Sequence, residues 1–273
     1  MLIAQITDLH IRPRGRAANR VAETNMMTER AVDVLNALRP RPDVVLITGD
    51  LVDCGIVEEY RQLKAILRRL ELPFFMVPGN HDRRENLKAA FADHPTIVAD
   101  KDFVQYVVDD YPVRLIALDT VVPGKGEGAL CARRLDFLAR ALAQNTEKPT
   151  VIFMHHPPFE CGIVHMDRIR LIEGAGRMAE IVAQHRNVAR ILCGHHHRPI
   201  ETLFAGTLAS ISPGVTHQVA LDLTEDHEGA LVLEPPAYQL HRYRPQTGIV
   251  SHMAYVERYP GPFPFLTADP TER

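Results

Sequence analysis

Hydrophobic residues along the chain form short apolar runs that alternate with amphipathic stretches. The runs are rich in β-branched residues and are bounded by polar turns, as is typical of buried strands; they cover residues 2–7, 44–48, 74–77, 150–154 and 189–193. Between them, apolar residues recur every three or four positions, which predicts helices over residues 28–38, 58–70, 133–142 and 176–185. This alternation predicts an α/β fold with a largely parallel core sheet.

Two further patterns predict a second sheet and a β-rich end. Residues 104–108 and 113–119 are apolar runs around a polar turn, so we expect an antiparallel pair there. After His197 the helical pattern stops, and strand-like runs follow at residues 201–204, 208–212, 219–223, 238–243 and 248–256. We expect a main domain over residues 1–223 and a β-rich extension over residues 224–273 that completes the second sheet, caps a site or contacts a partner subunit.

The composition is that of an ordinary globular protein. The chain has 273 residues, of which 46% are hydrophobic, so it can bury a substantial core. Its formal net charge is −3 and its basic residues are dispersed, which indicates no surface for a large nucleic acid. No apolar run could span a bilayer, and no export signal is evident. The four cysteines lack CxxC spacing, so we expect reduced thiols and a cytoplasmic protein.

Potential metal ligands stand directly after five of the predicted strands. In open α/β sheets ligands bind beyond the carboxyl ends of the strands, so a fold that aligns these ends gathers the side chains in one pocket. Imidazole mixed with oxygen ligands suits Zn, Fe, Mn or Co better than Ca or Mg. The pattern predicts a two-metal hydrolase. The candidate ligands are Asp8, His10, Asp50, Asn80, His156, His195 and His197.

Local chain geometry supports this grouping. Successive side chains of an extended chain alternate in direction, so His195 and His197 point the same way while His196 points away, to the solvent or to a supporting position. Asp8 and His10 have the same spacing. A glycine precedes three of the candidate ligands, where it permits a sharp turn and a close approach of the backbone. These are Gly49, Gly79 and Gly194.

The five blocks together resemble the calcineurin-like metallophosphoesterases. The blocks are Asp8-Leu9-His10, Gly49-Asp50, Gly79-Asn80-His81-Asp82, His155-His156 and Gly194-His195-His196-His197. They follow the order of the family pattern D-x-H, GD, GNH[DE], H and GHxH. The spacing between blocks and the β-rich end are most similar to the bacterial class III cyclic nucleotide phosphodiesterases and glycerophosphodiesterases. The resemblance implies a four-layer α-β-β-α sandwich of two mixed sheets with a small β-rich C-terminal cap or dimerisation extension.

The resemblance also implies roles for the ligands. One metal ion would take Asp8, His10 and His197, the second would take Asn80, His156 and His195, and Asp50 would bridge the two. A metal-bound hydroxide would then attack the phosphorus of a small phosphodiester in line. His155 is the alternative ligand to its neighbour His156.

Three further residues are expected near the substrate. The family places the histidine of the GNH[DE] block, His81, where it can stabilise the phosphoryl group or protonate the leaving alkoxide. Asp53 lies three residues after Asp50, the spacing at which some relatives keep an aspartate that orients this histidine, so we expect a pair of His81 and Asp53. Asn80 and His217 would also bind substrate. We read His165, His185, His227, His241 and His252 as lying outside the site.

The residues leave alternatives open. Taken singly, each aspartate or asparagine could be a turn or capping residue. A phosphomonoesterase of the same fold or a metal-free scaffold protein are the competing functions. Cyclic nucleotides, glycerophosphodiesters and similar diesters cannot be ranked from the ligands alone. The apolar groups among the prolines of the tail could pack on a partner subunit, over the mouth of a site or on the chain's own core; they are Tyr255, Tyr259, Phe263 and Phe265. The resemblance implies an oligomer, so we expect at least a dimer.

Overall fold

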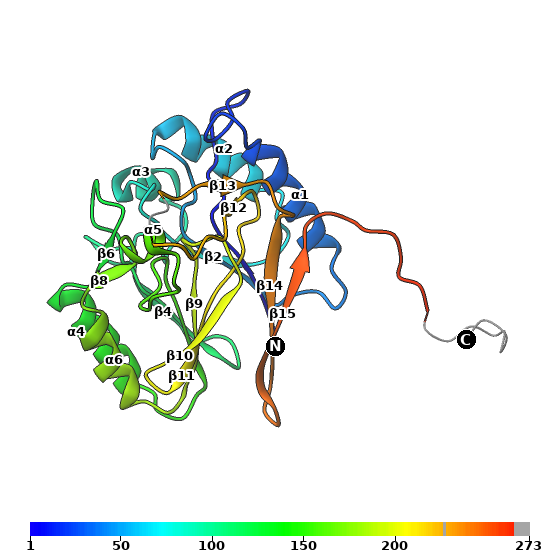
Figure 1. Cartoon of the computed structure of the whole chain (residues 1–273). Coiled ribbons are helices and arrows are strands. Elements are labelled where there is room, and N and C mark those ends of the chain that lie inside the picture. The colour runs from blue at the N-terminus through cyan, green and yellow to red at the C-terminus, as the bar shows by residue number, and fades with distance from the viewer. Residues whose placement is uncertain (226–227, 265–273) are drawn as a thin grey trace.

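Two mixed β-sheets pack face to face, and helices cover both outer faces (Figure 1). The computed structural model describes residues 1–225 and 228–264. The first sheet has the order β15-β14-β1-β2-β3 and the second has the order β10-β11-β9-β7-β5-β4. This is the four-layer α/β sandwich that the resemblance implies.

The first sheet contains three parallel strands and an antiparallel hairpin. Strands β1 (Leu2–Ile6), β2 (Val44–Thr48) and β3 (Phe74–Val77) run parallel, since βαβ crossovers connect them. On the other side of β1, strand β14 (Ala237–Arg244) pairs antiparallel with it, and β15 (Gly248–Tyr255) forms the edge. The prediction that the C-terminal strands complete the second sheet is therefore wrong for β14 and β15. The expected boundary at residue 223 precedes two strands of the sheet that holds β1.

The second sheet is built around four parallel strands. These are β5 (Arg114–Ala117), β7 (Thr150–Phe153), β9 (Val188–Cys193) and β11 (Thr207–Ile211). Strands β4 (Tyr106–Val108) and β10 (Ile200–Phe204) add antiparallel edges, and the predicted β4–β5 pair is confirmed. Two small sheets lie over the loops: β6 (Gly128–Ala129) with β8 (Leu171–Glu173), and β12 (Gln218–Val219) with β13 (Leu231–Val232).

The helices bury apolar stripes against the sheets. Helices α1 (Thr24–Ala37) and α2 (Val57–Leu67) pack beside the first sheet, and α4 (Ala132–Ala143) and α6 (Ala175–Ala183) cover the second. The sequence pattern did not predict α3 (Arg84–Ala90) or the single turn α5 (Val164–Asp167), because both are short. Within the described part of the chain, no helix has the length and apolarity needed to cross a membrane.

Candidate metal centre

The candidate ligands lie where β1, β2, β3, β7 and β9 end, at the same edge of the two sheets. The backbone there leaves the strands abruptly. Five of the eight described non-glycine residues with positive φ are candidate ligands: Asp8, His10, Asp50, His195 and His197. Positive φ is strained for residues with a Cβ, and such strain clusters at functional sites, where the surrounding structure holds it.

Glycine is required at the turn before Asn80. A Cβ on Gly79 would overlap the Asp50 carboxylate and its backbone nitrogen. The chain after β3 can therefore approach the end of β2 only without a side chain at this position. The close approach also lets the His81 backbone N–H donate to Asp50 Oδ1 over 3.0 Å. This hydrogen bond fixes one oxygen of Asp50 and leaves Oδ2 facing the site.

One half of the site gathers Asp8, His10, Asp50 and His197, all of them buried. His197 Nε2 lies 3.2 Å from Asp8 Oδ1 and 3.3 Å from His10 Nε2. Asp50 Oδ2 completes the group at 3.6 Å from His10 Nε2. Two atoms bound to one ion at about 2.1 Å lie about 3.0–3.4 Å apart at angles between 90° and 109°, which matches the closest of these spacings.

The other half gathers Asn80, His155 and His195 around the same Asp50 oxygen. His155 Nε2 lies 3.4 Å from Asp50 Oδ2 and 3.1 Å from Asn80 Oδ1. His195 Nδ1 lies 3.2 Å from the same nitrogen of His155. Asp50 Oδ2 therefore faces both halves, which is the position that a bridging carboxylate requires.

Each of the four histidines in these two groups has its second ring nitrogen committed to an outer acceptor. His10 Nδ1 donates to Asp53 Oδ1, and the other three donate to backbone carbonyls: His155 Nδ1 to Thr48, His195 Nε2 to Ile169 and His197 Nδ1 to His217. Such outer hydrogen bonds set the tautomer and turn the free lone pair toward the metal.

The inward nitrogens then face each other as acceptors. His10 Nε2 opposes His197 Nε2, and His155 Nε2 opposes both His195 Nδ1 and Asn80 Oδ1. Two lone pairs repel unless a positive charge lies between them. Although burial lowers the pKa of His155, Asp50 outweighs burial and raises this pKa to about 9, so the position beside Asp50 attracts a positive charge, which either a proton on Nε2 or a metal ion can supply. The chemistry of both halves fits a dinuclear metal site with histidine and aspartate ligands.

The ring nitrogen of His155, and not that of the expected His156, faces Asp50 and Asn80. One nitrogen of His156 does lie within 4.8 Å of nitrogens of His155 and His195. However, His156 Nδ1 accepts from Thr120 Oγ1 at 2.7 Å, and Nε2 donates to the Gly126 carbonyl at 3.1 Å. Both ring nitrogens of His156 thus make hydrogen bonds to residues outside the two ligand groups. Within this pair the geometry therefore favours His155, whose Nε2 faces Asp50 and Asn80, over the expected His156.

The expected pairing of His81 with the Asp53 carboxylate is also not what the structure contains. His81 Nδ1 lies 2.6 Å from the Asp53 backbone carbonyl but 3.8 Å from its carboxylate, which is too long for a hydrogen bond. The Asp53 carboxylate instead binds His10 Nδ1 and, at 3.2 Å, Arg12 Nη1. Asp53 therefore orients the ligand His10, and its backbone orients His81.

Replacing Asp53 with asparagine should weaken metal binding in the half of the site that contains His10. The amide keeps the shape but removes the charge that strengthens the His10 Nδ1–H hydrogen bond, and loss of such outer partners typically lowers metal affinity about 10- to 100-fold. A metal titration of the D53N variant measures this. An unchanged affinity with an altered pH–rate profile would instead favour the expected pairing with His81.

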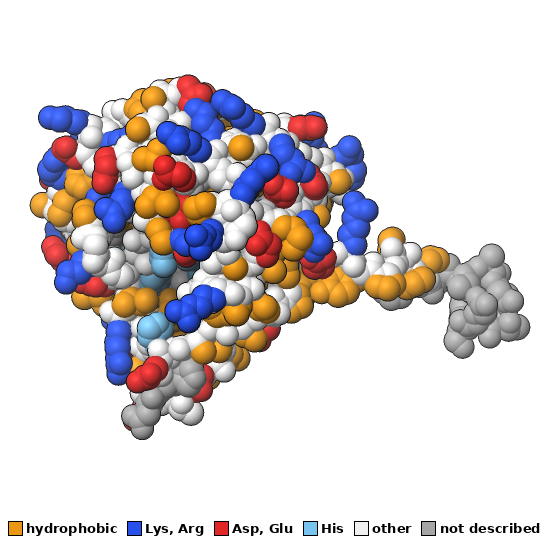
Figure 2. Space-filling model, turned by 90° about the horizontal axis from the view of Figure 1, so that it is seen from above, with side chains coloured by type: hydrophobic (Ala, Val, Ile, Leu, Met, Phe, Trp, Pro, Cys, Tyr) orange, Lys and Arg blue, Asp and Glu red, His pale blue; other side chains and the backbone are white. Residues whose placement is uncertain are grey.

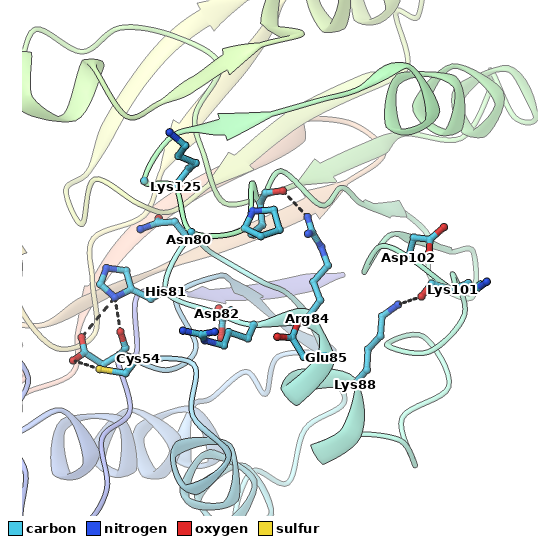
Figure 3. A pocket seen from close by; sticks show the side chains of 16 residues that line it. Cys54, Asn80, His81, Asp82, Arg84, Glu85, Lys88, Lys101, Asp102 and Lys125 are labelled. Carbon is cyan, nitrogen blue, oxygen red and sulfur yellow. Dashed lines mark hydrogen bonds and ion pairs between the residues drawn. The ribbon is translucent and has the colours of Figure 1, made fainter.

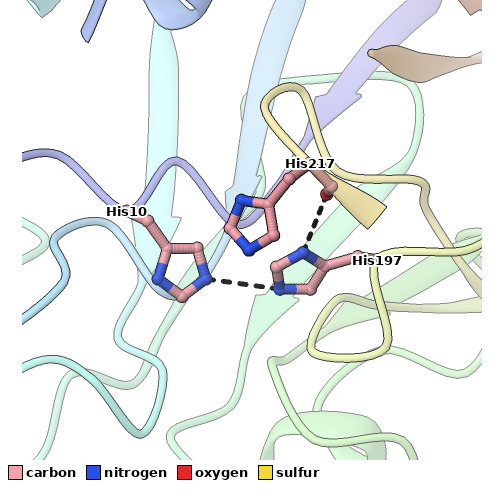
Figure 4. A group of neighbouring side chains, drawn as sticks. All are labelled: His10, His197 and His217. Atoms are coloured by element: carbon pink, nitrogen blue, oxygen red, sulfur yellow. Dashed lines mark hydrogen bonds between the residues drawn. The ribbon is translucent and has the colours of Figure 1, made fainter. Parts of the chain in front are cut away.

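His81 and His217 lie beside the metal centre without being part of either ligand group described above. His81 Nε2 is 4.0 Å from Asp50 Oδ2; burial opposes its charged form, but Asp50 and the Asp53 carbonyl raise its pKa. The His217 ring stands 4.7 Å from that of His197 and 5.2 Å from that of His10. Figure 4 shows the three rings side by side. Burial, followed by the charges of His197 and His10, lowers the pKa of His217 to about 3, so this imidazole is neutral.

A cavity of about 280 Å³ opens over the metal centre. In Figure 2 histidine side chains line a hollow in the surface. His165 and Ile169 line this cavity together with β12–β13 residues, although His165 was predicted to lie outside the site. The sequence gives no signal for His165, because it lies on a loop and short turn with no motif. His227 falls outside the described residues.

His196 is fully buried, which excludes the solvent-facing alternative, and its ring lies 5.3 Å from that of His195. Its two ring nitrogens have no hydrogen-bond partner among the described residues. Burial lowers its pKa to about 4, which keeps the ring neutral. The alternation of directions in the His195–His197 block is correct, but His196 points into the protein.

A family model and curated relatives both match this chain, and all of them are phosphoesterases. Residues 1–199 match the family model described as calcineurin-like phosphoesterase. A probable glycerophosphodiester phosphodiesterase from Arcobacter nitrofigilis is 36% identical over 97% of both chains. A probable cyclic nucleotide phosphodiesterase from Rhodopseudomonas palustris is 35% identical over 87% of this chain and 86% of its own.

A solved structure shares the fold at much lower identity. The dimetal phosphatase from Danio rerio superposes with a TM-score of 0.65 at 15% identity, over 94% of this chain and 99% of its own. At this identity the likeness concerns the fold alone.

Proposed function

The chain belongs to the calcineurin-like phosphoesterase family, and on this premise we propose that it is a metal-dependent phosphodiesterase that hydrolyses small phosphodiesters. The observation that carries the proposal is the pair of ligand groups that share Asp50 Oδ2. The relatives named above are a glycerophosphodiester phosphodiesterase and a cyclic nucleotide phosphodiesterase, both of which act on diesters. A metal-free scaffold would have no need of four histidines with inward lone pairs.

We propose that Asp8, His10 and His197 hold one metal ion, that Asn80, His155 and His195 hold the other, and that Asp50 bridges them. Mixed nitrogen and oxygen ligands suit Fe, Zn, Mn or Co. When bound, two such ions polarise the phosphoryl group and make a nucleophile available near neutral pH. The protein's own contribution is to fix the ligands: strained turns hold them and outer hydrogen bonds orient their rings.

His81 is the proposed catalytic acid or phosphoryl clamp. Its Nδ1–H is held by the Asp53 carbonyl, so Nε2 faces the site beside Asp50. The raised pKa favours the protonated ring near neutral pH, in which form Nε2–H can donate to a phosphoryl oxygen or to the leaving alkoxide. Asn80 and the neutral His217 stand on the same cavity and are the proposed further substrate contacts.

Metal removal and reconstitution test the proposed function directly. We expect a chelator to abolish hydrolysis of a bis-aryl phosphate and Mn or Co to restore it. Because metal binds the folded protein, the melting temperature should fall in the chelator and rise again with metal. Comparing kcat/KM among glycerophosphodiesters, cyclic nucleotides and an aryl phosphomonoester then ranks the substrates. Reconstituted protein that hydrolyses only the monoester would overturn the diester assignment.

We also propose that the protein is at least a dimer in the cytoplasm. Strand β15 is an eight-residue sheet edge, and Val250, Met253 and Tyr255 on it are each about 45% exposed. Such an edge offers unpaired backbone groups and apolar area to a second copy. Tyr259 and Phe263 extend this exposed apolar segment, and Phe265 lies outside the described residues. The four cysteines are free, as a reducing compartment would leave them.

Size-exclusion chromatography with light scattering should give at least twice the mass of 30.7 kDa. Because the edge strand would pair through its backbone, a proline at Val250 should weaken the association. A monomer at micromolar concentration would contradict the prediction.

A further inference from the structure

A second and larger cavity adjoins the metal centre. It has a volume of about 690 Å³, and Asn80 and His81 line both this cavity and the one over the metals. The two cavities therefore meet at the proposed phosphoryl position. A phosphodiester carries two ester arms, so one arm can extend into each cavity. The ligand geometry assigns no role to the larger one.

Most acidic side chains that line the larger cavity are already engaged. Its carboxylates are those of Asp53, Asp82, Glu85 and Asp102. Three of them have partners: Asp53 binds Arg12, Asp82 accepts from the Tyr60 hydroxyl, and Asp102 pairs with Arg133. Among the described residues only Glu85 lines the cavity without such a partner for its carboxylate.

The basic side chains of the cavity are less fully engaged. Arg84 is fixed, since it binds both oxygens of Asp119, and Lys88 donates to two backbone carbonyls. Over residues 1–225 and 228–264, the side chains of Arg83, Lys101 and Lys125 have no ion pair or hydrogen bond. Among the described lining residues without an oppositely charged partner, four are cationic and two are anionic, which favours an anionic ligand; the cations are Arg83, Lys88, Lys101 and Lys125, and the anions are Asp82 and Glu85.

Among these unpaired cations, Lys125 lies in a loop that hydrogen bonds attach to the metal centre. The neighbouring Gly126 carbonyl accepts the His156 Nε2–H, and the buried Thr120 hydroxyl fixes the other nitrogen of His156. The His156 ring is 4.6 Å from that of His195. His156 therefore connects the Lys125 loop, residues 122–126, to the metal centre. Figure 3 shows Lys125 at the same end of the pocket as Asn80 and His81, with Lys88, Lys101 and Asp102 toward the other end.

We infer that the larger cavity binds an anionic group, a carboxylate or phosphate, on one ester arm of the substrate, with Lys125 as the specificity-determining contact. His156 acts as a positioning residue for the Lys125 loop. The inference rests on the proposed phosphodiesterase function and adds the substrate class to it. A charged contact in a partly open pocket is modest in strength, and the expected five- to tenfold preference corresponds to about 1–1.4 kcal/mol.

Two matched substrates test this inference. Both are 4-nitrophenyl phosphodiesters, and the second alcohol is either 3-hydroxypropanoate, with a carboxylate, or 1,3-propanediol, which is neutral. In each case water adds to phosphorus, the P–O bond to the aryl group breaks, and 4-nitrophenolate leaves with an alkyl phosphate as the other product. We expect the Mn-reconstituted enzyme to favour the carboxylate substrate about five- to tenfold in kcat/KM, mainly through KM. The preference should shrink as salt screens the charges.

Variants at Lys125 separate this contact from general surface charge. Lys125→Gln should remove most of the preference, and Lys125→Arg should keep it. The control Lys148→Gln removes an equal charge just before β7, at the amino end of the sheet away from the site, and should leave the ratio unchanged. Calorimetric binding of the corresponding non-hydrolysable phosphonates to the metal-loaded enzyme should show the same order without turnover.

The outcomes distinguish the inference from the proposed function. A ratio near one, or a ratio that Lys125→Gln does not lower, overturns the anion subsite while leaving the phosphodiesterase intact. An equal loss in the Lys148→Gln control would mean that overall charge, and not this cavity, sets the preference. If neither diester is hydrolysed after reconstitution, the proposed function fails, and the inference fails with it.

Discussion

Replacing Asp50 with asparagine is expected to lower kcat at least about 10³-fold, which corresponds to about 4 kcal/mol of transition-state stabilisation. Asp50 Oδ2 lies between His10 and His155 and faces both ligand groups. An amide nitrogen or a neutral amide oxygen in its place cannot offset the charge of two cations. Metal analysis should accordingly show fewer than about two ions per chain in the variant.

The fold should survive this substitution, because asparagine keeps the volume of the side chain and can still accept the His81 N–H. Circular dichroism and the melting temperature of the metal-free proteins check that point. Asp136→Asn, the same chemical change on the exposed part of α4, is the matched control and should leave activity and metal content unchanged. Full activity in Asp50→Asn would refute the bridged two-metal arrangement.

The second large effect separates two adjacent histidines. His155→Asn should remove a ligand of the second metal, so one metal equivalent and most of the activity should be lost. The inward nitrogen of His155, 3.4 Å from Asp50 and 3.1 Å from Asn80, has no substitute nearby in the right position. We expect kcat to fall at least about 100-fold, since the metals carry the charge stabilisation.

His156→Asn should behave differently, because this residue holds the Thr120 hydroxyl and the Gly126 carbonyl. Losing buried hydrogen bonds should lower the free energy of unfolding by about 1–3 kcal/mol while both metals still bind. Metal analysis and denaturant unfolding of the two variants, side by side, decide the assignment. The reverse pattern, with metal lost in His156→Asn and kept in His155→Asn, would restore the ligand expected from the sequence.

The sequence predicted the block that contains these two histidines but not which of them faces the other ligands. Periodicity predicted the parallel strands and most helices, because burial on one or both faces leaves a pattern of apolar residues. The end of each strand then showed where polar side chains gather. The short helix α3 and the turn α5 were missed, since too few residues repeat for a period to be visible.

The C-terminal strands show a second limit. Their alternation was visible, but the choice of sheet was not, because either mixed sheet has an edge that could accept them. The register of β14 with β1, in which Leu2 lies opposite Arg242, comes from contacts 240 positions apart in the chain. The order of the strands therefore had to come from the tertiary structure.

The sequence by itself determined the fold class and the set of blocks that form the metal centre, because both depend on local patterns repeated in order along the chain. Only the tertiary structure turned His155 and not His156 toward Asn80, placed the Asp53 carboxylate against His10, and brought Lys125 to the pocket beside Asn80. The physical reason is the same in each case. A side chain's role depends on which atom faces which partner within about 3–4 Å, and these partners lie on strands and loops that are distant in sequence.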